Sequence, residues 1–407
     1  PKTLNFKNLN FKDEAQANES RWKLKNEIYR ENAYASFFAN GSYSLLGRYT
    51  LGGSIRMDGS DLFGVDKKYR FLPIYSVSGL WRLSSEPFIQ QHQKWIDNLA
   101  LRLSYGIQGN IDKNTSPFLL GSYKNTSLLP GAFEDYITID SAPNSKLRWE
   151  KTTSYNVGLD LAVLNQAINF SLDYYYRKGT DLIGYKMLPL ENGFESMAIN
   201  WASMSNQGVE VNLQTRNITT KHFSWYTSFN FAYNQNKVLR VMTDKNQTTP
   251  SLEGHPVGAV FNIKTKGIHP ETGQILLEDK DGRAVTVDEL FRMQPSGNLD
   301  GIYSIGASTE EIRNFYRYAG TTDAPYTGGL MNTFNYRGWE LNVNFSYTLG
   351  AHVQTTPSYL VSDLDPGINM NRDVLNRWTP ANKNGSLPAL ATYNTNPADY
   401  YLFSTRR

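Results

Sequence analysis

The chain has 407 residues, with 41 basic and 38 acidic side chains and a formal net charge of +3. This balance gives no indication of a nucleic-acid partner or of a polybasic membrane patch. Cysteine is absent, which excludes disulfides, thiolate metal ligands and cysteine nucleophiles. No run of about 18 apolar residues occurs, so no transmembrane helix is predicted.

The N-terminal residues 13–33 are rich in charge and are compatible with either a short helix or a solvated hairpin. Beyond them, the pattern predicts strands, in chain order, over 32–40, 42–58, 74–83, 97–108, 152–164, 167–181, 207–217, 221–237, 325–336 and 339–349. Asn40-Gly41 is predicted to be the tight turn between the first two strands, because this dipeptide tolerates positive φ. An Asp58-Gly59-Ser60 turn is predicted to end the second strand.

Five of these segments alternate between apolar and polar residues with a period of two. In the clearest one, from Trp339 to Tyr347, every odd residue is apolar or aromatic and every even residue is polar. The same pattern holds for Leu99, Leu101, Leu103, Tyr105 and Ile107, for Tyr155, Val157, Leu159 and Leu161, for Ile168, Phe170, Leu172, Tyr174 and Tyr176, and for Phe223, Trp225, Phe229, Phe231 and Tyr233. Because successive side chains of a strand point to opposite faces, each strand has one apolar and one polar face.

Alternation is also found in a soluble β-sandwich or barrel, where one face meets the core and the other meets water. Two features favour an outer-membrane barrel. The predicted strands match the roughly 9–11 residues that span a membrane at a tilt, whereas soluble strands cluster near about 5–6. Aromatic residues make up 13% of the chain, with 26 tyrosines, as interfacial girdles of Tyr and Trp would require.

Long polar segments separate the strands on one side only. Residues 110–145 are predicted to be a loop, residues 238–323 a very long excursion, and residues 351–397 a proline-containing loop. By contrast, Asn165-Gln166 is a short turn between two well-defined strands. Short turns at one end and long loops at the other are typical of outer-membrane barrels.

In such a barrel, the polar face would line the lumen. The residues expected there are Asn169, Ser171, Asp173, Asn342, Asn344 and Ser346. For any one of them, a generic wet wall that touches no substrate is the simpler interpretation, because a lumen is polar whatever it carries. The tyrosines Tyr316, Tyr318 and Tyr326 could stack on sugar rings from the loops, although girdle or loop-packing roles are the simpler expectation. No substrate-binding residue is identified.

Candidate metal ligands are few. Asp279-Lys280-Asp281-Gly282 with Asp288 resembles part of a calcium loop, but Leu277 occupies the first ligand position and Asp288 replaces the bidentate Glu. A plain Asp-Gly turn is therefore favoured, calcium is a weak alternative, and no cofactor is predicted. The histidines are scattered, without the spacing of a zinc site: His92, His222, His255, His269 and His352.

No motif of a hydrolase or of a nucleotide-binding protein occurs, so no catalytic residue is predicted. Asp363 and Asp365 could in principle flank a glycosidic bond, yet they stand in the turn sequence Asp-Leu-Asp-Pro-Gly. The chain is predicted not to be an enzyme.

The run Trp149-Glu150-Lys151-Thr152-Thr153-Ser154-Tyr155-Asn156-Val157-Gly158-Leu159-Asp160, with Phe170-Ser171-Leu172-Asp173-Tyr174-Tyr175 and Thr180-Asp181-Leu182-Ile183, resembles the C-terminal barrel of SusC/RagA-type TonB-dependent transporters of Bacteroidetes. Further matches are Arg48-Tyr49-Thr50, Arg56-Met57-Asp58-Gly59-Ser60, Met204-Ser205-Asn206-Gln207-Gly208-Val209-Glu210, Tyr326-Thr327-Gly328-Gly329-Leu330 and Arg377-Trp378-Thr379-Pro380. They follow the family order from about residue 31 to 382.

The resemblance implies an all-β fold, a segment of a transmembrane antiparallel barrel of about 22 strands with long extracellular loops. It also implies an outer-membrane importer of oligosaccharides or oligopeptides, occluded by an N-terminal plug and driven by the TonB complex. A SusD-like surface lipoprotein would cap the barrel, and such transporter-lid pairs are expected to form dimers.

Residues 1–407 are expected to be part of one TonB-dependent receptor barrel domain. Pro1 follows no signal peptide and a strand opens near residue 400, so we expect an internal fragment that lacks the plug and the last strands. Two other classes remain open. One is an outer-membrane adhesin or structural barrel that binds a surface partner without transport, and the other is a soluble carbohydrate-binding β protein.

Overall fold

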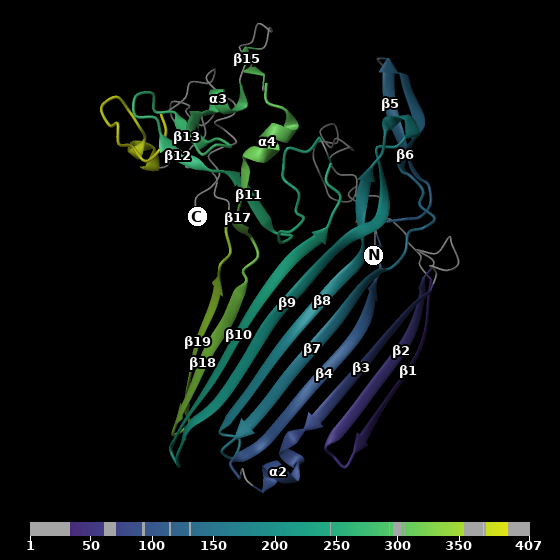
Figure 1. Ribbon diagram of the computed structural model, residues 1–407, viewed down its shortest axis with the longest axis vertical. Helices are drawn as coiled ribbons and strands as arrows, with labels where there is room; N and C mark the ends of the chain where they lie inside the picture. The colour runs from purple at the N-terminus through teal and green to yellow at the C-terminus, as the bar shows by residue number, and fades with distance from the viewer. Residues whose placement is uncertain are drawn as a thin grey trace, which may run out of the picture.

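The computed structural model describes residues 33–60, 71–91, 94–113, 115–129, 132–244, 246–292, 294–295, 303–304, 306–353, 369 and 372–389. Most of the predicted N-terminal helix or hairpin, together with His92, Asp363 and Asp365, lies outside these residues. Within the described part, ten antiparallel strands form one tilted, open sheet with β1 and β19 at its edges (Figure 1). In sheet order they are β1 (Tyr34–Leu45), β2 (Tyr49–Ser60), β3 (Phe71–Arg82), β4 (Ile96–Asn110), β7 (Glu150–Val163), β8 (Ile168–Met187), β9 (Ser196–Thr219), β10 (Phe223–Arg240), β18 (Tyr326–Tyr336) and β19 (Trp339–Leu349).

The strand register gathers the apolar residues of all ten strands on one face of the sheet. Residues directly opposite each other in an antiparallel pair share a face. Phe345 lies opposite Leu330, which lies opposite Phe229, and the same register continues through Leu213 to Phe170. Many of these side chains are exposed, among them Phe37, Leu51, Leu103, Leu341 and Phe345. A soluble protein would bury such a face, whereas a membrane protein presents it to lipid.

The turn between β1 and β2 differs from the prediction. Asn40-Gly41 lies inside β1, and the chain turns at Leu46 and Gly47, both of which have positive φ. A two-residue turn at Asn40-Gly41 would have placed Phe37 opposite Ser44 and mixed apolar with polar side chains on one face. The observed turn places Phe37 opposite Met57 instead, so the apolar face is kept intact.

The two ends of the sheet are connected differently, as Figure 1 shows. At one end, β7 and β8 are joined by residues 164–167, β9 and β10 by residues 220–222, and β18 and β19 by residues 337–338. At the other end, the connections include residues 111–149 and 241–325. This asymmetry confirms the prediction and identifies the short-turn end as periplasmic and the long-loop end as extracellular. No described helix is long and apolar enough to cross a membrane.

The segment predicted as a loop over 110–145 contains a second hairpin. Its strands, β5 (Leu120–Leu129) and β6 (Ala132–Ser141), pair with each other outside the main sheet and project at the extracellular end (Figure 1). The chain then returns through a small core in which Leu147 is fully buried against Leu72, Trp149 and Ala198. The sequence analysis predicted a loop here because the two strands of the hairpin contain polar as well as apolar residues.

The excursion after β10 folds into a small extracellular unit. Its elements are β11 (Ala259–Ile263), β12 (Thr265–Ile268), β13 (Ile275–Glu278), β14 (Ala284–Thr286), α3 (Val287–Phe291), β15 (Gln294–Pro295), β16 (Tyr303–Ser304), α4 (Thr309–Phe315) and β17 (Tyr316–Thr321). Leu277, Val287, Leu290 and Phe291 form its buried core. Thr286 caps α3 through a capping box. The excursion therefore leaves the sheet, as predicted, but it has a core of its own.

The central strands are longer than predicted. β9 has 24 residues and β10 has 18, whereas the pattern predicted strands over 207–217 and 221–237. Their added residues lie mainly at the extracellular end, beyond the roughly 9–11 residues that cross a bilayer. In the added part of β9, apolar side chains stand at both odd and even positions, such as Ile199 and Met204, so alternation no longer marks the strand.

A buried carboxylate ties the periplasmic ends of three neighbouring segments together. Glu86 precedes α2 (Pro87–Gln90) in the β3–β4 connection and is only 6% exposed. It accepts hydrogen bonds from the Tyr49 hydroxyl, from the Trp81 indole at 3.0 Å and from Arg48 at 3.2 Å. Tyr49 and Trp81 lie opposite each other on the apolar face, with their rings stacked at 6.2 Å. We call these four residues the Glu86 clamp.

The Glu86 clamp predicts a pH dependence of stability. The bonds from Tyr49 and Trp81 hold the pKa of Glu86 below its usual value, which is about 4.3 in an unfolded chain. The clamp therefore stabilises the fold fully above that value and loses its contribution as pH falls through the lowered folded pKa. We expect the melting temperature of the detergent-solubilised protein to fall more steeply below about pH 4 in the wild type than in Glu86→Gln. Parallel curves for the two proteins would contradict this.

Candidate functional site

The polar side chains form a second continuous face on the opposite side of the sheet. Ser171 lies opposite Asn212, Asn212 opposite Asn230, Asn230 opposite Gly329 and Gly329 opposite Ser346. This single row crosses five strands from β8 to β19. Because the other face is apolar and exposed, the polar face is the one that can meet water in the lumen. We call it the luminal face.

All six residues predicted for the lumen lie on the luminal face. Asn169, Ser171 and Asp173 come from β8, and Asn342, Asn344 and Ser346 come from β19. The register connects the two groups, since Asn169 lies opposite Gln214, and that row ends at Asn344. Their placement agrees with the prediction, and any contact with cargo stays a prediction.

The luminal face carries a charged triad that sequence reasoning did not identify. Arg102 of β4 donates two hydrogen bonds to Asp160 of β7, at 2.7 and 3.0 Å, and one to Asp173 of β8, at 2.9 Å. Ser171 donates a further bond to Asp173 at 3.3 Å. A planar guanidinium suits this role because it can bridge two carboxylates at once.

A glycine makes room for the triad. Gly158 lies opposite both Arg102 and Asp173 in the sheet. A Cβ atom at this position would lie 2.6 Å from the Asp173 Oδ1 and 2.7 Å from the Arg102 Cζ. The arginine can therefore cross β7 only because residue 158 has no side chain. The period-two pattern could have placed Arg102 and Asp160 on the polar face, but it could not have paired them.

A second contact crosses three strands higher on the luminal face. Tyr175 of β8 reaches over Gly208 of β9 and donates a hydrogen bond to the Asn234 side chain of β10 at 2.9 Å. Nearby, Asn236 donates to Asn206 at 2.8 Å. These amides and the tyrosine give the upper wall neutral hydrogen-bonding groups, whereas the triad gives the middle wall fixed charge.

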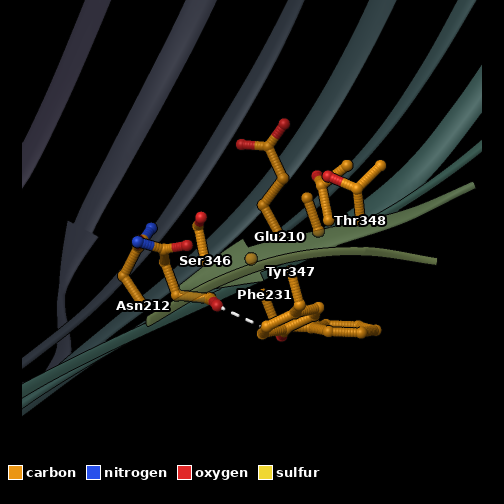
Figure 2. A pocket seen from close by; sticks show the side chains of 10 residues that line it. Glu210, Asn212, Phe231, Ser346, Tyr347 and Thr348 are labelled. Atoms are coloured by element: carbon orange, nitrogen blue, oxygen red, sulfur yellow. Dashed lines mark hydrogen bonds between the residues drawn. The ribbon is translucent and has the colours of Figure 1, made fainter. Parts of the chain in front are cut away.

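A hollow of about 360 Å³ lies over β9, β10, β18 and β19. Figure 2 shows Glu210, Asn212, Ser346 and Thr348 on one side of these strands. The rings of Phe231 and Tyr347 lie on the other side. The Tyr347 hydroxyl donates to the backbone oxygen of Asn230 at 3.4 Å, the dashed line of Figure 2. The Tyr347 ring lies against Gly328, where a Cβ atom would overlap it. The polar side chains that line the hollow suit a hydrated solute rather than an apolar one.

The three candidate tyrosines lie in three different environments. Tyr316 packs against the core of the extracellular unit, where burial raises its pKa. Tyr318 is stacked on His255, with ring centroids 4.8 Å apart. Tyr326 is the first residue of β18, as the strand predicted over 325–336 implies, and not a loop residue; it lies on the apolar face, with its ring centroid 5.1 Å from that of Tyr233. A lipid-facing position suits Tyr326 to an interfacial girdle.

The Asp279 region forms a tight turn between β13 and β14. The Gly282 amide donates to the Asp279 carbonyl at 3.1 Å, and the Asp279 carboxylate accepts bonds from Asp281 and Arg283. Burial raises the pKa of Asp279, but the bonds from Arg283 and Asp281 outweigh it and hold that pKa below its usual value. In the described part of the chain, no three acidic, histidine or cysteine side chains gather into a metal site.

The described histidines have separate structural surroundings. His255 contacts the rings of Phe261 and Tyr318. The His269 imidazole accepts bonds from the Glu271 and Thr272 amides at 3.2 Å.

Residues 4–364 match the family model described as TonB dependent receptor-like, beta-barrel. The TonB-dependent receptor P3 of Formosa agariphila is 27% identical over 394 residues, which cover 92% of this chain and 37% of that protein. The TonB-dependent receptor SusC of Bacteroides thetaiotaomicron is 33% identical over 215 residues, which cover 52% of this chain and 21% of that protein.

A solved structure titled as the RagAB peptide transporter superposes with a TM-score of 0.72 at 25% identity. The match covers 93% of this chain and 41% of that one. This chain thus spans well under half the length of the relatives that it matches.

Proposed function

This chain belongs to the TonB-dependent receptor β-barrel family, and from that premise we propose that it forms part of the wall of an outer-membrane importer for oligosaccharides or oligopeptides. One observation carries the proposal. A polar face with fixed charges and amides lies behind an exposed apolar face over ten consecutive strands. Such a sheet separates lipid from a wide aqueous lumen, as import of a large hydrophilic solute requires.

The oligopeptide alternative has support among the relatives. SusC and the RagAB peptide transporter are similar to this chain at 33% and 25% identity, and the second is titled a peptide transporter. The luminal face combines the Arg102 triad with neutral amides such as Asn212 and Asn230. Amides can hydrogen-bond with sugar hydroxyls or with peptide groups.

The proposed partners act at the two ends of the barrel. We propose that a SusD-like lipoprotein caps the extracellular end, where the unit over 241–325 projects above the sheet (Figure 1), and that transporter-lid pairs form dimers. At the periplasmic end, the TonB complex would act on a plug domain, for which the greater length of the relatives leaves room. The chain itself would bind and guide cargo without covalent chemistry and without a cofactor.

The test is uptake of labelled oligosaccharides and oligopeptides by cells that carry the intact protein. We expect Ser346→Trp to reduce uptake several-fold, because the indole would project from the luminal face. Phe345→Trp is the matched control, since it places the same side chain one residue away on the lipid face. Uptake should also disappear when TonB is depleted.

A different result would favour the second candidate, an adhesin or structural barrel. Surface binding of a partner without uptake of either cargo class would contradict import. Equal effects of Ser346→Trp and Phe345→Trp would contradict the assignment of the luminal face, whether or not cargo enters.

A further inference from the structure

A cavity lies where β10 meets the extracellular unit. Three chain segments contribute to its lining, from residues 233–237 of β10 and from residues 254–256 and 321–325 of the extracellular unit. Its volume is about 340 Å³, within the range of small-molecule sites, about 300–1,000 Å³. The cavity and the hollow over Asn212 and Ser346 share no lining residue, so the two are separate. We call it the junction cavity.

One wall of the junction cavity is the edge of β10 beyond its pairing with β18, which ends one residue before Asn234. The Asn234 amide donates to the Pro325 carbonyl at 2.9 Å. Four residues further along β10, the Val238 amide donates to the His255 carbonyl at 2.8 Å. Backbone groups of alternate residues point to the same edge of a strand, so the amide and carbonyl of Asn236 face this edge between the two bonds.

The edge at Asn236 is open to another chain. Among the described residues, no backbone hydrogen bond to the extracellular unit occupies the Asn236 amide or carbonyl, although this residue lines the junction cavity. A sheet edge with free amide and carbonyl groups is a template for an extended peptide, which adds to it as a further strand.

The junction cavity also carries two opposite charges. Asp323 lines it from the extracellular unit and Lys237 lines it from β10. Within the described part of the chain, neither side chain forms an ion pair, and the two do not pair with each other. A carboxylate and an ammonium group that stay apart in one cavity can each attract the opposite charge of a single ligand.

Fixed groups from both the wall and the extracellular unit surround the junction cavity. The Asn236 side chain accepts a hydrogen bond from the Val257 amide at 2.7 Å and donates one to Asn206 of β9 at 2.8 Å. The rings of Tyr318 and His255, which also line the cavity, are stacked with their centroids 4.8 Å apart. A ligand in the cavity would therefore contact the wall and the unit at the same time.

We propose that the junction cavity binds a short peptide with charged termini, in an extended conformation along the edge of β10. The peptide backbone pairs with Asn236, its terminal ammonium faces Asp323 and its terminal carboxylate faces Lys237. A neutral oligosaccharide has neither these charges nor a backbone that extends a sheet. The inference rests on the proposed function and deepens it, because it selects peptides from the two cargo classes. A bound peptide also holds the extracellular unit against the wall.

The experiment measures binding of trialanine to the intact protein in detergent by isothermal titration calorimetry. We expect Asp323→Asn and Lys237→Gln each to weaken binding on the order of tenfold. This is the lower end of what a hydrogen bond to a charged group contributes, because both side chains are exposed. Trialanine with an acetylated N-terminus and an amidated C-terminus has no terminal charge and should bind the wild type more weakly than either variant binds free trialanine.

Each variant has a matched control. Lys178 and Lys237 both lie opposite Ser205, in the two strands that flank it, but Lys178 does not line the junction cavity. Lys178→Gln should therefore bind trialanine like the wild type. Glu271→Gln removes an exposed carboxylate of the same extracellular unit outside the cavity and should also have no effect. The proposal is overturned if the controls weaken binding as much as Lys237→Gln and Asp323→Asn, or if maltotriose displaces trialanine.

Hydrogen exchange locates the peptide. Trialanine should slow exchange in residues 233–238 and 254–258, and protection confined to the strands around Asn212 and Ser346 would overturn the junction site. The uptake assay separates this inference from the proposed function. Binding at the junction cavity in a protein that takes up neither cargo class supports the site and contradicts import alone. Peptide uptake without binding at the junction cavity contradicts this inference alone.

Discussion

Replacing Gly208 with valine is expected to destabilise the centre of the sheet. Gly208 lies in β9 between Tyr175 of β8 and Asn234 of β10, and any Cβ atom there would overlap both the Tyr175 ring and the backbone oxygen of Tyr233. A side chain can rotate away, but a backbone carbonyl in a strand cannot. Valine must therefore displace the backbone of β10 and also expel the Tyr175 ring, which would break the bond from Tyr175 to Asn234. Overpacking of this kind costs about 1–3 kcal/mol.

The matched control is Gly184→Val in β8. Nothing lies within 4 Å of a Cβ atom built at Gly184, so the same substitution should be close to neutral and could benefit from the strand propensity of valine. Unfolding of the intact protein by urea in detergent micelles measures both. The explanation fails if Gly208→Val and Gly184→Val unfold at the same urea concentration. The close approach of β8, β9 and β10 at Gly208 would then not require a glycine.

Replacing Arg102 with methionine is the second large perturbation. Methionine keeps much of the side-chain length but leaves Asp160 and Asp173 without the guanidinium that bridges them. Breaking a fully buried ion pair costs about 3–5 kcal/mol. The Arg102 and Asp160 side chains are 36% and 32% exposed, so water screens the charges and we expect a smaller loss of about 1–2 kcal/mol.

Two further variants separate the charge from the bulk of the side chain. Arg177→Met removes another luminal arginine, which lies over the Tyr175 ring at 5.0 Å and has no ion pair among the described residues, so its effect should be small. Adding Asp173→Asn to Arg102→Met removes one of the unpaired carboxylates and should recover part of the lost stability. If Arg102→Met unfolds like Arg177→Met, the triad does not stabilise the wall.

The period-two pattern predicted the faces of the sheet better than it predicted the ends of its strands. Alternation is strict in β19, where Trp339 to Tyr347 cross the membrane, and there the predicted bounds and faces were confirmed. β9 continues from Ser196, well before its predicted start at residue 207. Its added residues carry apolar side chains at both odd and even positions, such as Ile199 and Met204, because part of this end packs into an extracellular core through Ala198. Period-two alternation therefore does not mark this part of the strand.

Three luminal residues that the sequence analysis did not single out show the same limit of the pattern. Arg102, Asp160 and Tyr175 stand at positions that alternation assigns to the polar face. Their contacts depend on which strands are neighbours and on the missing side chains of Gly158 and Gly208. A single sequence does not contain the register between strands, so it could not show that an arginine in β4 reaches an aspartate in β8.

By itself, the sequence determined the class of fold, the two faces of the strands and the sides on which the short turns and long loops lie, because each depends on residues close together in the chain. Only the tertiary structure decided the turn at Leu46-Gly47, the β5–β6 hairpin and the pairing of β10 with β18 across residues 241–325. Those features depend on contacts between distant segments. Closing such long loops costs entropy, which backbone pairing and side-chain burial must offset, and local sequence does not reveal where that occurs.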